Sequence, residues 1–232
     1  VPIAFFLAFF QGFGILSNWS SRLTEPKTLY VYFAILILLT VILSALFLNN
    51  ISVSITVTNL MISSILAGLI YYSFLQIKHS RNVNLSMGLS HFGIAVMILG
   101  IGLVSSLESQ KELIAFKEKP FELENYKITY LGEEKNIAQN FSSDEVSFRV
   151  ENFNQKFNLI AEKRYYPVSK SVMTEAAIHP SIKEDLYISI GNQVEEGWVV
   201  KAQLKPFVRL IWLGALIMAF GGFLSLFRFK GL

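Results

Sequence analysis

The chain contains no cysteine, and Lys, Arg, Asp and Glu together make up only 16% of its 232 residues. The absence of cysteine excludes disulfides, thiolate metal sites and a cysteine nucleophile within these residues. Soluble domains carry about a quarter charged residues. The scarcity of charge, together with a mean hydropathy of +0.47, therefore predicts a membrane protein.

Acidic residues are almost missing outside one central segment. Residues 107–206 hold 13 Lys and Arg and 16 Asp and Glu, whereas the rest of the chain holds seven basic residues and one acid, Glu25. The pI of about 9.0 thus arises from basic residues that flank apolar segments. We therefore expect membrane lipid, and no nucleic acid, among the partners.

Five apolar segments are long enough, or nearly so, to cross a bilayer as helices, which takes about 20 residues. The chain begins inside the first of them, without the charged region that starts a secretory signal. We therefore expect the sequence to be the C-terminal piece of a longer polypeptide, or a trimmed one. The predicted spans are residues 1–16, 29–48, 55–76, 87–106 and 207–227.

The connections between these spans alternate in charge. Basic residues follow the first, third and fifth spans, and the connection after the second carries no charge. The positive-inside rule then puts the three basic connections in the cytoplasm. The N-terminus and the segment 107–206 are expected in the periplasm, and the C-terminus in the cytoplasm. The basic residues are Arg22, Lys27, Lys78, Arg81, Arg228 and Lys230.

The central polar segment has the pattern of a β domain. Its apolar, β-branched and aromatic residues alternate with polar ones, and residues 133–136, 152–154 and 195–197 are typical of turns. Six to eight short strands in about a hundred residues predict a small barrel or sandwich. The predicted strands include residues 126–132, 146–150, 156–166 and 198–204.

These patterns define the fold class. We expect a polytopic α-helical membrane protein, with about five transmembrane helices and an inserted periplasmic all-β domain. The expected domains are residues 1–106, with four transmembrane helices and short loops; residues 107–206, the periplasmic β domain; and residues 207–232, the final helix and a short cytoplasmic tail.

His91 is the most informative of the three histidines, because it lies about one turn into the fourth span. An ionisable residue inside a span is costly and is a candidate functional residue. Small neighbours (Gly88, Ala95 and Gly102) share its helix face. They leave room for a flat macrocycle, but they equally suit close helix packing. Ligation of heme iron, a hydrogen bond to a neighbouring helix and proton relay all remain open.

The remaining candidates have plainer interpretations. His79 lies in a short basic loop, and His179 precedes a proline, so both are expected in surface loops. The charged and aromatic run at residues 162–166 predicts a solvated edge strand, or a surface where an extended partner segment docks. Motifs for phosphate binding, metalloproteases and α/β-hydrolases are absent, and no carboxylate pair lies in a span. No catalytic residue is therefore assigned.

Several stretches resemble the late part of CcmF, the large heme lyase subunit of the System I cytochrome c maturation machinery. The resemblance covers nearly the whole chain. It is carried by SHFG at residues 90–93 with its glycine-rich span, AEKRYYPVSKSVMTEAAI at 161–178, KEDLYISIG at 183–191 and WVVKAQLKPFVRLIWLGALIMAFGGFLSLF at 198–227.

The resemblance implies an inner-membrane protein that takes heme from a periplasmic heme chaperone. It further implies delivery of that heme to the CXXCH motifs of apocytochrome c, with small System I partner subunits holding the apoprotein. The family also holds a b-type heme (heme b) inside the membrane. Its late intramembrane histidine, an axial ligand of the iron, maps onto His91.

Other features of the family have no counterpart here. The tryptophan-rich WWD segment is absent, since the only tryptophans are Trp19, Trp198 and Trp212. The flanking external histidines and the first intramembrane histidine, which supplies the second axial ligand, are also missing. We expect these parts upstream in the same polypeptide or in a separately encoded subunit.

Two other classes of protein remain as alternatives. A membrane permease component requires polar residues that face one another across several spans, and the chain offers few besides Gln11, Asn59 and Gln76. A membrane anchor that displays a β adaptor domain requires no heme, and His91 would then be replaceable by leucine. Heme content separates both alternatives from a heme lyase subunit.

Overall fold

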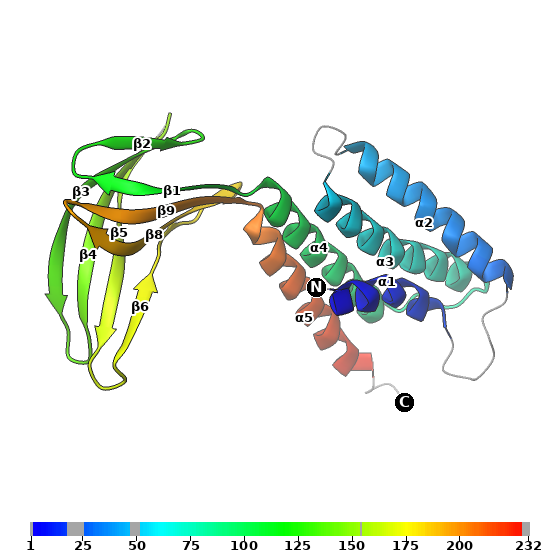
Figure 1. Cartoon of the computed structure of the whole chain (residues 1–232). Coiled ribbons are helices and arrows are strands. Elements are labelled where there is room, and N and C mark those ends of the chain that lie inside the picture. Colours follow the sequence, from blue (N-terminus) through cyan, green and yellow to red (C-terminus); the bar gives the residue numbers. More distant parts are fainter. Residues whose placement is uncertain (1, 18–25, 47–51, 154, 229–232) are drawn as a thin grey trace. The chain divides into compact units, whose positions relative to one another are not determined.

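A computed structural model describes residues 2–17, 26–46, 52–153 and 155–228. Residues 1–106 and 207–232 form a helical unit, and residues 107–206 form a β unit (Figure 1). The β unit thus lies between two helical segments in chain order. Apolar helices with an inserted β-sandwich confirm the predicted fold class.

The helical unit contains α1 to α5. Four of these helices are long and apolar enough to cross a membrane, and α1 is apolar but shorter. Arg22 and the loop after the second predicted span lie outside the described residues. The helices are α1 (Pro2–Leu16), α2 (Pro26–Leu46), α3 (Val53–Lys78), α4 (Leu85–Leu107) and α5 (Val208–Arg228).

Small residues let these helices approach one another closely, as in other membrane bundles. A Cβ added at Gly12 of α1 would collide with the backbone of Ser64 of α3, and one added at Gly68 would collide with Gly12. On α4, a Cβ at Gly93 would lie 2.6 Å from the Met218 nitrogen of α5. Backbone proximity therefore defines both helix pairs.

A chain of hydroxyl groups also links the first three helices. Ser64 Oγ donates to the Phe9 carbonyl oxygen of α1. The Tyr32 hydroxyl of α2 lies 2.6 Å from Ser64 Oγ, so it donates its own hydrogen there. Because both hydroxyls are buried, this pairing avoids the cost of an unsatisfied polar group in an apolar surrounding.

The β unit consists of two antiparallel sheets. One has the strand order β1-β9-β8-β7 and the other β2-β3-β4-β5-β6. Nine strands occur in the described residues, more than the six to eight expected. They are β1 (Ser109–Phe116), β2 (Pro120–Leu123), β3 (Tyr126–Ile137), β4 (Ser142–Glu151), β5 (Lys156–Tyr166), β6 (Ser171–Glu175), β7 (Ala177–His179), β8 (Glu184–Val194) and β9 (Gly197–Pro206).

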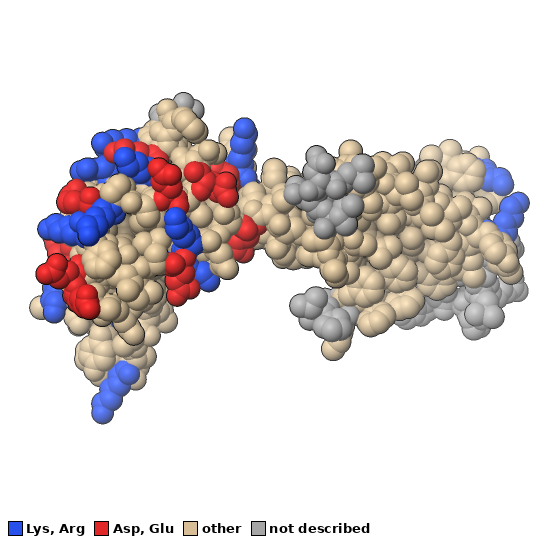
Figure 2. All heavy atoms as spheres, turned by 45° about the horizontal axis from the view of Figure 1, so that its top comes forward, with Lys and Arg blue, Asp and Glu red and all other residues tan. Residues whose placement is uncertain are grey.

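Apolar and polar side chains alternate along the strands, and the apolar ones form the core of the β unit. Val146, Phe148 and Val150 of β4 are fully buried, and they face Leu186 and Val200 of the other sheet within one apolar cluster. In Figure 2, Lys, Arg, Asp and Glu cover the β unit, whereas the helical surface in view is mostly uncharged. The charge asymmetry of the sequence therefore coincides with the two units.

Two local predictions in the β unit were wrong. Residues 133–136 continue β3 instead of forming a turn, because Glu133 accepts hydrogen bonds from Trp198 Nε1 and from Gln193 across the sandwich. The charged run at residues 162–166 belongs to β5, which lies between β4 and β6 and is therefore not an edge strand. In both cases the prediction was based on local polarity, whereas the observed strand pairing gives neither a turn nor an edge strand.

Candidate functional site

The first turn of α4 is fixed by Asn84. Its side-chain Oδ1 accepts a hydrogen bond from the Met87 backbone nitrogen (3.3 Å), and its carbonyl oxygen accepts one from the Gly88 nitrogen (2.9 Å). Asn is a favoured N-cap, since it satisfies backbone donors that the helix leaves free. The cap thus sets where α4 begins, and it places His91 in the second turn of the helix.

His91 is half-buried, and its ring lies back against the preceding turn. Nδ1 is 2.9 Å from the Met87 carbonyl oxygen, four residues earlier. A carbonyl oxygen can only accept, so Nδ1 carries the hydrogen and Nε2 of a neutral ring has a free lone pair. Nε2 makes no hydrogen bond within the described part of the chain. The side chain is therefore oriented as a ligand with one available nitrogen.

The small neighbours of His91 separate into two kinds. Ala95 is buried in a cluster with Ile62 and Ile65 of α3, and a Cβ at Gly102 would collide with Thr58 of the same helix. These two positions serve helix packing. Around Gly88, in contrast, no described side chain and no backbone atom of another described element lies within 4 Å of an added Cβ, leaving aside its two chain neighbours. The His91 ring is therefore also more than 4 Å from that position.

The geometry of His91 is that of a side chain able to ligate heme iron. A neutral imidazole with a hydrogen-bonded Nδ1 and a free Nε2 is the usual donor for such iron, and a carbonyl partner of this kind orients the ring. Among the described residues, no group of three or more His, Cys, Asp or Glu could hold a metal ion.

The structure places the two other histidines at the end of α3 and in β7. His79 caps the C-terminus of α3 and is exposed. His179 ends β7, not a loop as expected, and its ring stacks on Phe157 with centroids 3.9 Å apart.

Some polar residues in the helices are paired with one another. Besides the link through Ser64, Asn59 is buried and its Nδ2 donates to Ser44 Oγ at 3.4 Å. Such pairs hold helices together in a membrane. The buried Ser63 hydroxyl, in contrast, has no hydrogen-bond partner among the described residues.

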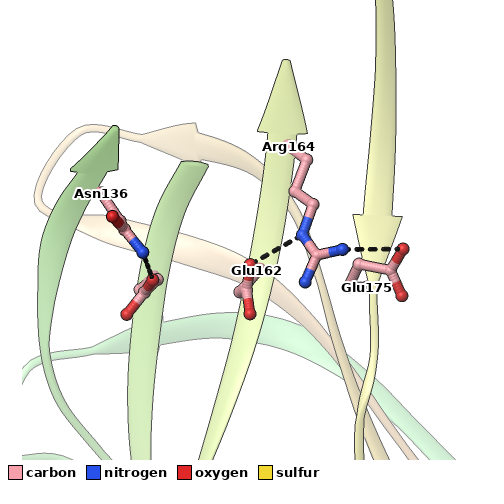
Figure 3. Close-up of polar contacts among 5 residues, drawn as sticks. Asn136, Glu162, Arg164 and Glu175 are labelled. Carbon is pink, nitrogen blue, oxygen red and sulfur yellow. Dashed lines mark hydrogen bonds and ion pairs between the residues drawn. The ribbon is translucent and has the colours of Figure 1, made fainter. Parts of the chain in front are cut away.

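The charged run of β5 forms a cross-strand cluster around Arg164, shown in Figure 3. Arg164 Nε donates to Glu162 at 2.8 Å, and its NH1 lies 3.6 Å from Glu175 of β6. Its guanidinium also lies 4.7 Å from the ring centroid of Phe141. The hydrogen bond to Glu162 is the main cause that raises the pKa of Arg164 above its ordinary value. The cluster therefore ties β5 to the edge strand β6.

Residues 106–206 match the family described as the CcmF C-terminal beta-sandwich. The chain is 39% identical over 141 residues to the cytochrome c-type biogenesis protein CcmF of Pseudomonas aeruginosa, an alignment that covers 60% of this chain and 22% of the relative. It is 32% identical over 235 residues to CcmF of Escherichia coli, covering 98% of this chain and 36% of the relative. The chain belongs to the CcmF family.

A solved structure titled cytochrome c heme lyase CcmF has the same fold. It matches with a TM-score of 0.73 at 15% identity, over 96% of this chain and 38% of the solved chain. The chain spans about a fifth to about a third of the length of the curated CcmF relatives named above. The predicted resemblance to the C-terminal portion of CcmF is thereby confirmed, and this portion is a multi-pass membrane protein.

Proposed function

We propose that this chain is the C-terminal part of a CcmF-like heme lyase subunit that acts in cytochrome c maturation. In this proposal, the protein lies in the inner membrane and receives heme from a periplasmic heme chaperone. It helps to deliver that heme to CXXCH motifs of apocytochrome c, together with small System I partner subunits. Similarity to proteins named for cytochrome c biogenesis supports the assignment.

The observation that carries the proposal is the geometry of His91. Its Nε2 would hold the iron of a b-type heme, while the Met87 carbonyl oxygen keeps the hydrogen on Nδ1. A bound heme would supply one-electron redox chemistry at this position. The chain would bind and orient this group through His91.

The β unit is assigned to contacts with partners in the periplasm. The basic residues Lys27, Lys78 and Arg81 near the helix ends support a cytoplasmic location of those connections under the positive-inside rule, and the proposal accordingly puts residues 107–206 in the periplasm. A charged sandwich in that compartment can contact the heme chaperone or the small partner subunits. Deletion of residues 107–206 is expected to abolish co-purification of these partners and cytochrome c maturation, and unchanged co-purification would contradict the assignment.

Heme content of the full-length protein tests the assignment of His91. The assay uses this chain together with whatever polypeptide supplies the rest of the protein, and it measures heme per polypeptide and reduced-minus-oxidised spectra. His91→Ala is expected to lose most of the b-type absorbance. His79→Ala is the matched control, because His79 is exposed at the end of α3. If wild type and His91→Ala contained the same amount of heme per polypeptide, His91 would be a packing residue and not a ligand.

A wild-type protein without heme would instead favour an anchor that displays the β unit. Cytochrome c maturation in cells provides a separate readout for that outcome. If His91→Leu supported full maturation in addition, the heme lyase proposal would fail.

A further inference from the structure

The five-stranded sheet carries four glutamates in one row across β3, β4, β5 and β6. Each of them lies directly opposite the next in the strand register, and such residues point to the same face of a sheet. The row consists of Glu134, Glu145, Glu162 and Glu175. Val146 and Ala161, which follow two of these glutamates, are fully buried in the core. Because side chains alternate along a strand, the row lies on the outer face, turned away from the other sheet.

This row is only partly neutralised. Arg164 lies 2.8 Å from Glu162 and 3.6 Å from Glu175 (Figure 3), and it is the only basic residue in the described part of the chain within ion-pair distance of the four carboxylates. Lys163, the next residue along β5 from Glu162, points the other way and donates to the Gly191 carbonyl oxygen of the other sheet. Four carboxylates and one guanidinium leave the row with a net charge of −3. Like charges opposite one another destabilise a sheet, so folding alone does not account for the row.

An unpaired hydroxyl lies beside the row. Ser143 is directly opposite Arg164 and two residues from Glu145, so it is on the same outer face. Its side chain is buried, with 4% exposed, and its Oγ has no hydrogen-bond partner among the residues that the structure describes. An unpaired buried hydroxyl costs free energy. The row and the hydroxyl are therefore both groups that a bound hydrogen-bond donor would satisfy.

The sign and the spacing of these charges select the kind of ligand. A negative face repels nucleic acid and the headgroups of anionic lipids. Nor do the described residues contain a group of three or more His, Cys, Asp or Glu that could hold a metal ion. Strands in a sheet lie about 4.8 Å apart, so four strands span about 14 Å, the length of four to five residues of extended chain at about 3.3 Å each. A segment with basic residues at alternate positions matches the row in charge and in length.

We propose that the outer face of the five-stranded sheet binds an extended basic segment of a partner polypeptide, whose Lys or Arg side chains pair with the glutamate row. This inference rests on the proposed function, in which the β unit contacts partners in the periplasm, and it adds the face of the sandwich and the charge of the segment. Glu134 and Glu145, which contact no basic residue in the described part of the chain, are the main contacts. Arg164 holds the other two carboxylates in place.

Binding of a labelled peptide to the full-length protein in detergent tests the proposal. The probe is a short peptide of alternating Lys and Thr, and a second peptide with Glu in place of Lys is the control. Only the basic peptide is expected to bind, and its affinity is expected to fall as the salt concentration rises. Glu134→Gln combined with Glu145→Gln is expected to raise the Kd by about 2- to 25-fold, because one exposed ion pair contributes about 1.5- to 5-fold.

The turn between β8 and β9 offers a matched control. Glu195→Gln combined with Glu196→Gln removes the same charge from this exposed turn and is expected to leave the Kd unchanged. The double variant of the row is expected to keep its β-sheet circular dichroism and to be at least as stable as the wild type, since repulsion is relieved. Glu134→Lys combined with Glu145→Lys is expected to bind the acidic peptide instead, a reversal that a purely structural role of the row would not produce.

An unchanged Kd in the glutamine variant of the row, or equal binding of both peptides by the wild type, would overturn the proposal. Loss of the β-sheet signal together with binding would also overturn it, because the row would then serve folding. Co-purification separates this result from the proposed function. If deletion of residues 107–206 abolishes co-purification of partners while the row variants bind the peptide like wild type, the face is refuted and the proposed function stands. If the deletion leaves co-purification unchanged, the proposed periplasmic contact fails, and the inference fails with it.

Discussion

The two units of this protein are held together in different ways. In the β unit, 18 buried residues from both sheets form one apolar core. In the helical unit, the buried clusters are small, and many large apolar side chains are exposed. Burial of apolar groups away from water stabilises the β unit. Lipid is as apolar as the helices, so the helical unit depends on close backbone approach and paired hydroxyls instead.

Because of this difference, different kinds of substitution are expected to destabilise the two units. Removal of atoms is most damaging where a large side chain fills a core. Addition of atoms is most damaging where the absence of a side chain brings two helices together. The following changes test the contrast in order of expected effect, with unfolding of each unit followed separately by its β-sheet or α-helical circular dichroism.

The largest effect is expected from Phe148→Ala in the β unit. Phe148 is fully buried, pairs with Tyr130 and Leu159 on the neighbouring strands, and belongs to the shared core. Its truncation is expected to destabilise the β unit by about 3–5 kcal/mol. Thermal or chemical unfolding of the β-sheet signal measures the loss. A change below about 1 kcal/mol would contradict a core of this kind.

A smaller effect is expected from Gly12→Ala in the helical unit. The added methyl would collide with the Ser64 backbone of α3, so α1 must move away from it. Overpacking of this kind costs about 1–3 kcal/mol. Unfolding in SDS, followed by the helical signal, measures the cost.

Gly14→Ala is the matched control in the same helix. Outside α1's own backbone, no atom of the described residues lies within 4 Å of a Cβ at Gly14, so the substitution is expected to be neutral or stabilising by up to about 1 kcal/mol through helix propensity. Equal destabilisation by both substitutions would refute the assignment of Gly12 to the contact between α1 and α3.

Alkaline pH provides a third test, directed at the β unit. Burial raises the pKa of Tyr126 above its ordinary value of 10.0, and the nearby Glu184 carboxylate, to which its hydroxyl donates at 3.1 Å, raises it further. The folded state thus holds the phenol proton more tightly than the unfolded state. Stability is therefore retained below pH 10 and falls as the pH rises above it.

Tyr126→Phe separates this titration from the rest of the unit. The variant is expected to lose about 1 kcal/mol at neutral pH with the hydrogen bond to Glu184, and its stability is expected to decline less steeply above pH 10. Unfolding curves at several alkaline pH values measure both changes. An unchanged slope would show that Tyr126 is not among the groups responsible.

The sequence was sufficient to predict the helices, because long apolar runs have few alternative structures. Prediction was less successful in the β unit, where residues 133–136 have the composition of a turn but continue β3. The structure places an irregularity just before these residues, at Gly132, which has a φ of 154° and a register shift beside it. The bonds from Trp198 and Gln193 that hold Glu133 in the sandwich join residues about sixty positions apart, so no local pattern contains them.

The candidate site was predictable only in part. The position of His91 in a span follows from hydropathy, and its contact with Met87 follows from helix geometry. Gly88 and Gly102 are equivalent in the sequence, as glycines on one helix face. Only the packing of α3 against α4 shows that Thr58 lies against Gly102, whereas no described residue of another helix lies within 4 Å of a Cβ at Gly88.

The smallest effect is expected where a residue other than glycine has a left-handed backbone. Ser80, with a φ of 52°, directly follows His79, the C-terminal cap of α3, and the Arg81 nitrogen donates to the Gln76 carbonyl oxygen at 2.8 Å. Lys170, with a φ of 51°, lies between β5 and β6. Glycine adopts this conformation without strain. Ser80→Gly and Lys170→Gly are therefore each expected to stabilise by about 0.5–1 kcal/mol, an effect comparable to other backbone substitutions.

Each of these two substitutions is expected to act on its own unit. Ser80→Gly should raise only the helical transition in SDS, and Lys170→Gly only the β-sheet transition on heating, because the two residues belong to separate compact units. Ser80→Ala serves as a control that shortens the side chain without relieving the backbone. If either glycine variant shifted both transitions equally, the two units would unfold as one, and the contrast between their modes of stabilisation would have to be abandoned.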